Sequence, residues 1–263
     1  MRRGVFMDSE KIDYLARLWI MEAAAKIKQS FKETLDIDVK SGRNDLVTNM
    51  DKETEAFFVQ QIKDHFPDHR LFGEEGMASD VTDLDGVVWI LDPIDGTLNF
   101  VEQQRDFAIS LAVYEDGIGQ LAYIYDVARD ELYFGEKGKG ATVNGRTIPK
   151  LDPAIDLKDT LLIANLSVTR KFPTMWEAVK ASRGLRLHGA ASLEYMDVAT
   201  GRAGAYLSAN LAPWDIAAGK IIVEELGGKV TRINGEKINM LEKGSSIVAS
   251  PKIHQTLLDN YLP

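Results

Sequence analysis

The feature that most constrains the fold of this chain is an apolar strand that ends directly in acidic residues. Residues 87–91 read Val-Val-Trp-Ile-Leu and run at once into Asp92-Pro93-Ile94-Asp95-Gly96-Thr97. An unbroken apolar run bounded by turn residues predicts a buried strand. Carboxylate oxygens at its end are the ligands that Mg²⁺ prefers, and the Gly-Thr pair frees backbone N–H groups for an anion. We therefore predict a metal-assisted reaction on a phosphate.

Composition limits what else the chain can be. Its 263 residues, 45% of them hydrophobic, can bury a full core as one large domain or as two joined halves. The absence of cysteine excludes disulfides, thiolate metal sites and a cysteine nucleophile, so a metal must bind oxygen or histidine ligands. No apolar run reaches the roughly 18 residues of a membrane helix, and no signal-peptide core follows the N-terminus. We expect a soluble, unexported, cytoplasmic protein without a membrane partner.

The net charge of −9 argues against a nucleic-acid partner, because nucleic-acid binders normally carry a basic face. It also means that an anionic substrate needs a local source of positive charge. Divalent cations held by carboxylates would supply that charge.

The first half of the chain is predicted to combine helices with an antiparallel meander. Helical spacing of apolar residues predicts one helix over 9–35 and a second that opens with Asp51 as its N-cap and stops at Pro67. A strand is predicted at 70–72, ahead of the central strand. Later strands are predicted at 107–114, 119–126 and 131–135, with a hairpin turn at Asn144-Gly145.

Polar turn residues at 152–159 are the best candidate for a boundary. We expect an N-terminal α+β half, residues 1–152, with the main metal motifs, and a C-terminal α/β half, residues 153–263, which supplies Asp215 and substrate contacts. The two halves would form one compact unit. Elements predicted in the second half are strands at 161–166, 185–187, 205–207, 229–233 and 246–249, and helices at 174–182, 191–200, 214–226 and after Pro251.

Three further acidic clusters accompany the central motif, and each has two readings. Asp51, which follows Leu46-Val47-Thr48, is either a helix N-cap or a catalytic acid. The pair Glu74-Glu75, flanked by glycines, is either an exposed turn or a ligand pair. Asp215 lies in the first turn of a small-residue helix, where it either caps the helix or is brought inward by close helix packing.

Taken together, these motifs resemble the signatures of the inositol monophosphatase family. The matching residues are Gly-Glu-Glu at 73–75, Asp-Pro-Ile-Asp-Gly-Thr at 92–97 followed by Asn99-Phe100, and Trp-Asp-Ile-Ala-Ala-Gly at 214–219, with Leu46-Val47-Thr48 and Asp51. Their order and spacing cover almost the whole chain. The resemblance implies an α/β fold in a layered α-β-α-β-α sandwich, usually a homodimer. It also implies a Mg²⁺-dependent, Li⁺-sensitive hydrolase of phosphate monoesters.

The resemblance assigns roles to individual positions. Glu74, Asp92 and the backbone carbonyl of Ile94 would hold a first Mg²⁺; Asp92, Asp95 and Asp215 would hold a second, and a third ion would bind mainly through Glu74 and water. Gly96 and Thr97 would donate backbone N–H groups to the phosphate. Thr97, paired with Asp51, would orient or deprotonate the attacking water, and Glu74 completes the catalytic set.

Substrate choice is the loosest part of the resemblance. Family members that act on inositol phosphate contact it through the equivalents of Asp95, the backbone near Ala191, Asp215 and a glutamate seven residues before that aspartate. Here the last position is Ser208. We predict inositol 1-phosphate as substrate, with NADP, fructose 1,6-bisphosphate and 3′-phosphoadenosine compounds as alternatives. Arg186 and His188 are either ordinary strand residues or contacts for a second anionic group.

Two other classes of protein compete with this interpretation. Haloacid-dehalogenase phosphatases use Asp-x-Asp-Gly-Thr with the first aspartate as nucleophile. Here two residues separate Asp92 from Asp95, which disfavours a phosphoenzyme. A non-catalytic metal-binding or interaction module would keep the fold, but every candidate ligand is present in this chain.

Overall fold

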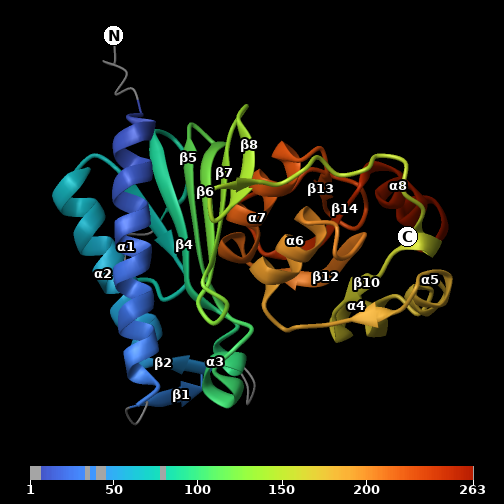
Figure 1. Cartoon of the computed structure of the whole chain (residues 1–263), viewed down its shortest axis with the longest axis horizontal. Helices are drawn as coiled ribbons and strands as arrows, with labels where there is room; N and C mark the ends of the chain where they lie inside the picture. Colours follow the sequence, from blue (N-terminus) through green and yellow to red (C-terminus); the bar gives the residue numbers. More distant parts are fainter. Residues whose placement is uncertain (1–6, 33–35, 40–45, 78–80, 263) are drawn as a thin grey trace.

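The chain forms five alternating layers of helices and sheets in a computed structural model, which describes residues 7–32, 36–39, 46–77 and 81–262. Helices α1 (Ser9–Ser30) and α2 (Asn49–His65) cover one face of a large sheet. Helices α6 (Ala191–Ala199) and α7 (Pro213–Glu225) lie between this sheet and a smaller one. The far face of the smaller sheet is covered by α4 (Leu166–Lys171), α5 (Met175–Ala181) and α8 (Pro251–Asn260) (Figure 1). The predicted α-β-α-β-α sandwich is confirmed.

The large sheet has seven strands in the order β3-β4-β5-β6-β7-β8-β9. Their bounds are β3 Arg70–Gly73, β4 Val87–Asp95, β5 Ala108–Glu115, β6 Ile118–Asp126, β7 Glu131–Glu136, β8 Gly140–Val143 and β9 Arg146–Thr147. Strand β3 is parallel to β4, and the following pairs are antiparallel. Asn144 and Gly145 have φ values of 47° and 75°, as a type I′ hairpin turn requires, so that predicted turn is confirmed.

The smaller sheet has five strands in the order β11-β10-β12-β14-β13. Their bounds are β10 Leu162–Ala164, β11 Leu185–Arg186, β12 Ala205–Leu211, β13 Lys229–Thr231 and β14 Gly244–Ala249. The remaining elements are β1 Ile37–Val39, β2 Leu46–Thr48, α3 Thr97–Gln103 and a 3₁₀ turn at Leu157–Asp159. No described helix has both the length and the apolar composition of a membrane span.

Strand β4 is buried along its whole length because both of its faces are covered. Side chains alternate between the faces of a strand. Trp89 and Leu91 accordingly pack in the core under α1 and α2, whereas Val88 and Ile90 pack in the core under α6 and α7. The pairing of β4 with β5 shifts register between Asp92 and Asp95, where Pro93 offers no N–H to the ladder. Strand β4 therefore remains buried up to and including Asp92 and Asp95.

Two local predictions are corrected. Asp51 is not the N-cap of α2: the helix begins at Asn49, Thr48 is the N-cap and Asp51 is the third helical residue. The Thr48 hydroxyl accepts from the Met50 N–H, while the Asp51 carboxylate accepts from the Thr48 N–H, so the two side chains form a reciprocal cap. Helix α1 ends at Ser30, and residues 33–35, over which it was predicted to continue, lie outside the described residues.

The second half also departs from its prediction at the end of β10. The predicted strand over 161–166 ends at Ala164, and the unpredicted helix α4 follows because the Asn165 side chain accepts from the Val168 N–H and caps it. Strand β12 extends to Leu211, four residues beyond its predicted end at Leu207. The division of the chain at 152–153 stays a prediction.

Helix α7 packs closely against α6, as its small residues predict. A Cβ atom at Gly219 would lie 2.4 Å from the Tyr195 ring, so only glycine allows this approach. Pro213 opens the helix, where its missing N–H costs nothing, and Gly227 follows the helix with φ of 86°. This packing brings the first turn of α7, with Asp215, toward the end of β4.

Candidate active site

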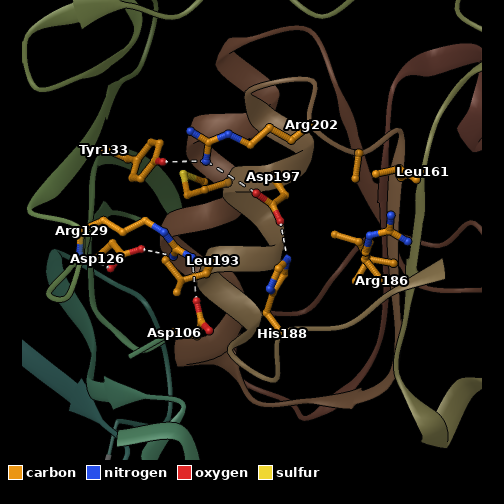
Figure 2. Close-up of a pocket in the computed structure, with 13 residues that line it drawn as sticks. Asp106, Asp126, Arg129, Tyr133, Leu161, Arg186, His188, Leu193, Asp197 and Arg202 are labelled. Atoms are coloured by element: carbon orange, nitrogen blue, oxygen red, sulfur yellow. Dashed lines mark hydrogen bonds and ion pairs between the residues drawn. The ribbon is translucent and has the colours of Figure 1, made fainter. Parts of the chain in front are cut away.

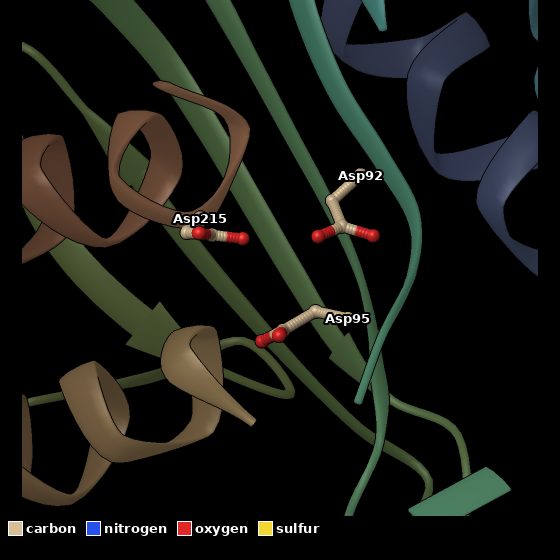
Figure 3. A group of neighbouring side chains, drawn as sticks. All are labelled: Asp92, Asp95 and Asp215. Carbon is tan, nitrogen blue, oxygen red and sulfur yellow. The ribbon is translucent and has the colours of Figure 1, made fainter. Parts of the chain in front are cut away.

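Three carboxylates converge where β4 ends against α7. Asp92 and Asp95 come from β4 and Asp215 from α7, and each offers an oxygen within 4.8 Å of the others. Figure 3 shows the three side chains directed toward a shared space between strand and helix. The fold thus brings Asp215 next to Asp92 and Asp95, although Asp92 and Asp215 are 123 positions apart in the sequence.

Backbone donors fix the orientation of each carboxylate. Asp92 Oδ1 accepts from the Ile94 N–H at 3.1 Å, and Asp215 Oδ2 accepts from the Ala212 N–H at 2.7 Å. Asp95 is held by the start of α6: its oxygens accept from the N–H groups of Ala191 at 3.1 Å and Ser192 at 2.6 Å, and from the Ser192 hydroxyl.

The electrostatics of this cluster favour a bound cation. Burial, and then the charges of Glu74, Asp95 and Asp215, raise the pKa of Asp92 well above its ordinary value. Burial raises the pKa of Asp95 to about 6, although its hydrogen bonds oppose the change. Burial and the charge of Asp95 raise the pKa of Asp215 to about 8. Acids that repel one another in a buried site are relieved by a divalent cation.

Glu74 joins the cluster from the end of β3. Strand β3 is parallel to β4, and the Glu74 N–H donates to the Leu91 carbonyl at 3.3 Å. The charge of Glu74 contributes to the raised pKa of Asp92, with which its side chain shares a hydrogen bond. Oxygen donors only, several of them anionic, suit a hard cation such as Mg²⁺. The residues present therefore fit this metal.

Thr97 and Asp51 form a second functional pair beside the carboxylates. Thr97 Oγ1 lies 3.1 Å from Asp51 Oδ1 and 3.0 Å from the Ile94 carbonyl oxygen. Asp51 also accepts from the Thr48 N–H and hydroxyl, at 2.8 and 2.6 Å. Its pKa is nevertheless raised to about 6, because burial outweighs these bonds. Asp51 thus takes part in the cap as the third helical residue and also contacts Thr97; its role as a catalytic acid stays a prediction.

Gly96 makes the turn that places Thr97 at the first position of α3. Its φ is 92°, and a Cβ atom there would lie 3.0 Å from the Ala190 Cβ and 3.1 Å from the Asp106 carbonyl oxygen. A side chain is therefore excluded by both conformation and space. The result is a tight approach of the Gly96 backbone to the residue before α6 and to the backbone of Asp106.

The predicted substrate residues lie in two different environments. Ala191 directs its backbone N–H at Asp95, beside the cluster. Ser208 is fully buried on β12, and its hydroxyl accepts from the Asn165 Nδ2 at 2.5 Å. Asn165 in turn caps α4 through Oδ1. The hydroxyl of Ser208 is thus already used in a side-chain pair.

Arg186 and His188 line a separate cavity of about 340 Å³ between α6 and the turn after β6 (Figure 2). His188 Nε2 lies 2.9 Å from Asp197 Oδ2, and Arg202 bridges Asp197 and the Tyr133 hydroxyl. The carboxylates Asp92, Asp95 and Asp215 do not line this cavity. A contact between these residues and a second anionic group stays a prediction.

Sequence reasoning missed two residues that support the site from outside. Ser192 binds Asp95 through both its N–H and its hydroxyl. Glu55 is fully buried and binds the loop after Glu74. A signal for Glu55 exists in its spacing, because it follows Asp51 by four residues and shares its helix face. Ser192 had no comparable signal, since its partner is 97 residues away.

Comparisons with known proteins agree with this geometry. Residues 8–262 match the family model described as the inositol monophosphatase family. The chain is 46% identical to inositol-1-monophosphatase of Bacillus subtilis, over 96% of this chain and 97% of that protein. It superposes with a TM-score of 0.87 on inositol monophosphate-bound SaIMPase-II, at 35% identity over 96% of this chain and 93% of that one. An IMPase/NADP phosphatase complexed with Mg²⁺ and phosphate gives 0.88, at 34% identity over 97% and 98% of the two chains.

Proposed function

The chain belongs to the inositol monophosphatase family, and from this we propose that it is a Mg²⁺-dependent phosphomonoesterase that hydrolyses inositol 1-phosphate. The observation that carries the proposal is the group of three carboxylates from β4 and α7 within 4.8 Å of one another. Their raised pKa values mean that the metal-free site is electrostatically strained. The relative from Bacillus subtilis supports the substrate.

Metal binding is assigned to the residues that the cluster contains. Glu74, Asp92 and the Ile94 carbonyl would hold one Mg²⁺, and Asp92, Asp95 and Asp215 a second. When bound, the metal supplies Lewis-acid stabilisation of the phosphate oxygens and lowers the pKa of water. A third ion near Glu74 is part of the proposal. The structure with Mg²⁺ and phosphate belongs to a relative, and it supports the choice of metal.

Thr97 and Asp51 are assigned to the proton transfer. The Thr97 hydroxyl can donate to Asp51 Oδ1, which leaves its oxygen lone pairs free to accept a hydrogen bond from the attacking water. With this donation the Ile94 carbonyl, the other acceptor near Thr97, is free for the metal. Asp51, buried and with a pKa of about 6, suits a group that accepts a proton near neutral pH.

Substrate binding is assigned to groups around the same space. The N–H groups of Gly96 and Thr97, at the start of α3, would bind the phosphate, because a helix N-terminus favours an anion. Asp95, Asp215 and the backbone near Ala191 would contact the alcohol portion. Ser208 would contribute a hydroxyl in place of a carboxylate once Asn165, with which the buried hydroxyl is paired, releases it. Position 208 then carries no charge that would select a polyol. This lack of a carboxylate supports a broader substrate range.

A second candidate substrate is NADP, with the same chemistry. The relative solved with Mg²⁺ and phosphate is an IMPase/NADP phosphatase, and this chain is as similar to it as to SaIMPase-II. Fructose 1,6-bisphosphate and 3′-phosphoadenosine compounds remain further alternatives. A homodimer and a cytoplasmic location also remain proposals, and analytical ultracentrifugation of the purified chain tests the first.

The test is Mg²⁺-dependent phosphate release from inositol 1-phosphate, NADP, fructose 1,6-bisphosphate and 3′-phosphoadenosine 5′-phosphate, each with and without Li⁺. We expect Li⁺-sensitive release with the highest kcat/KM for inositol 1-phosphate. A higher value for NADP would move the assignment to the alternative. Absence of release from all four would favour a non-catalytic module that binds metal.

A further inference from the structure

Helix α2 carries a second buried acid, Glu55, one turn after Asp51. Side chains four residues apart lie on the same face of a helix, and both acids have 0% of their surface exposed. Asp51 contacts Thr97, whereas Glu55 reaches the loop that follows β3. One helix face therefore meets two separate parts of the site.

Glu55 uses both of its carboxylate oxygens on the backbone of that loop. Oε2 accepts from the Glu75 N–H and Oε1 from the Met77 N–H, each at 2.7 Å. Gly73 leaves room for these bonds, because a Cβ atom there would lie 2.4 Å from the Glu55 carboxyl carbon. Burying a carboxylate is costly unless it is hydrogen-bonded. Here the cost of burying the Glu55 carboxylate is offset by its two hydrogen bonds to a short surface loop.

Glu74 lies between two anchors as a result. Its own N–H binds the Leu91 carbonyl on β4, and the next N–H, that of Glu75, binds Glu55 on α2. The backbone on both sides of Glu74 is thus fixed before any ligand binds. A metal-coordinating residue whose backbone is already ordered loses less conformational entropy when the metal binds.

We infer that Glu55 is a positioning residue that holds the loop 73–77 so that Glu74 faces Asp92, and that it thereby sets the affinity of the site for divalent cations. The inference rests on the proposed role of Glu74 as a metal ligand. Removal of an outer partner of a metal ligand typically weakens metal binding 10- to 100-fold. Chemistry at saturating metal should depend little on Glu55, because it contacts neither Thr97 nor the carboxylates of Asp92, Asp95 and Asp215.

The variant Glu55→Gln tests this inference because it keeps the size of the side chain but replaces one acceptor oxygen with an NH₂ donor. The probe is Mn²⁺, titrated into metal-free protein with free Mn²⁺ measured by electron paramagnetic resonance. We expect the Mn²⁺ dissociation constant to rise roughly 10- to 100-fold. Amide hydrogen exchange at Glu75 and Met77 should accelerate about tenfold or more without metal, and kcat at saturating Mg²⁺ should stay within about threefold of wild type.

Glu53→Gln is the matched control, since Glu53 is an exposed glutamate on the same helix. It should change none of these values. Unchanged Mn²⁺ affinity and amide exchange in Glu55→Gln would overturn the inference. A large loss of kcat at saturating Mg²⁺ with unchanged Mn²⁺ affinity would also overturn it, because Glu55 would then act in the chemistry.

A second variant keeps the test decisive if Glu55→Gln does not fold. Gly73→Ala pushes a methyl group against the Glu55 carboxylate, and the same changes in exchange and Mn²⁺ affinity are expected. The proposed function fails separately: wild-type protein that binds Mn²⁺ but hydrolyses no phosphate ester would refute the enzyme and leave the role of Glu55 standing. Protected amides in a wild-type protein that binds no Mn²⁺ would refute the role of Glu55.

Discussion

Replacing Asp215 with asparagine should stabilise the metal-free protein while abolishing its activity. Burial and the charge of Asp95 raise the pKa of Asp215 to about 8, whereas an aspartate in an unfolded chain titrates near pH 3.9. Between about pH 4 and pH 8 the folded protein therefore retains a proton that the unfolded chain has released. The stability of the metal-free wild type must fall as pH rises through this window. Asparagine carries no charge and removes the contribution of Asp215 to that fall.

The size of the effect follows from the geometry. Two carboxylate charges at the 4.8 Å limit of the cluster repel by about 3 kcal/mol at an effective dielectric constant of roughly 20. Raising a pKa from about 4 to about 8 corresponds to roughly 5 kcal/mol as an upper limit. Asp215 keeps some contact with solvent, and the screening that this allows lowers the value. We expect a gain of about 2–4 kcal/mol at pH 8, or roughly 5–10 °C in Tm.

The assay is thermal unfolding in EDTA and in excess Mg²⁺ at pH 5 and pH 8. Asp215→Asn should raise Tm in EDTA at pH 8 more than at pH 5, and Mg²⁺ should stabilise it less than wild type. Asp259→Asn, which removes an exposed aspartate, is the control and should leave Tm within about 1 °C. A lower Tm for Asp215→Asn in EDTA at pH 8 would refute the argument that the carboxylates repel one another in the metal-free site.

Three further substitutions test other parts of the account. Thr97→Val removes the hydroxyl that binds Asp51, and it should lower kcat about 10²- to 10⁴-fold with Mn²⁺ affinity unchanged. Steady-state kinetics and metal titration measure the two values, and a kcat near that of wild type would exclude Thr97 from proton transfer. Gly96→Ala forces a side chain into φ of 92° and against Ala190, and should cost about 1–3 kcal/mol in urea unfolding; an unchanged midpoint would contradict this. Ser208→Ala should raise KM for inositol 1-phosphate about 2- to 10-fold with kcat unchanged, and an unchanged KM would exclude Ser208 from substrate binding.

Much of the fold could be predicted because apolar runs or alternating apolar and polar residues, bounded by turn residues, indicate its strands. The β4 run of Val87 to Leu91 is apolar on both faces, and it is indeed covered on both faces. One helix that was missed and one helix start that was misplaced depend on side-chain caps. Helix α4 exists because Asn165 caps it, and α2 begins three residues earlier because Thr48 and Asp51 share the cap. Such caps compete closely with alternative turns, so periodicity alone does not locate them.

The carboxylate cluster could be predicted because its motif residues are unusual for their positions. Two acids at the end of a buried strand are unusual, because the burial of a carboxylate is costly, so Asp92 and Asp95 indicate chemistry. Ser192 and Glu55 contact the cluster or its loop from elements far apart in sequence, and their geometry depends on how α6 and α2 pack. Nothing in the local sequence distinguishes Ser192 from an ordinary helix residue, whereas the only sequence signal for Glu55 is its spacing of four residues from Asp51.

The most direct test of the central claim is phosphate release from inositol 1-phosphate by wild type and by Asp92→Asn, each with Mg²⁺ and with EDTA, with folding checked by circular dichroism. Asp92 lies at the centre of the cluster, where Glu74, Asp95 and Asp215 all act on it. We predict release by the wild type with Mg²⁺ only, and a loss of at least about 10³-fold in folded Asp92→Asn. Release by wild type in EDTA, or by Asp92→Asn at the wild-type rate, would contradict a metal-dependent reaction at this site.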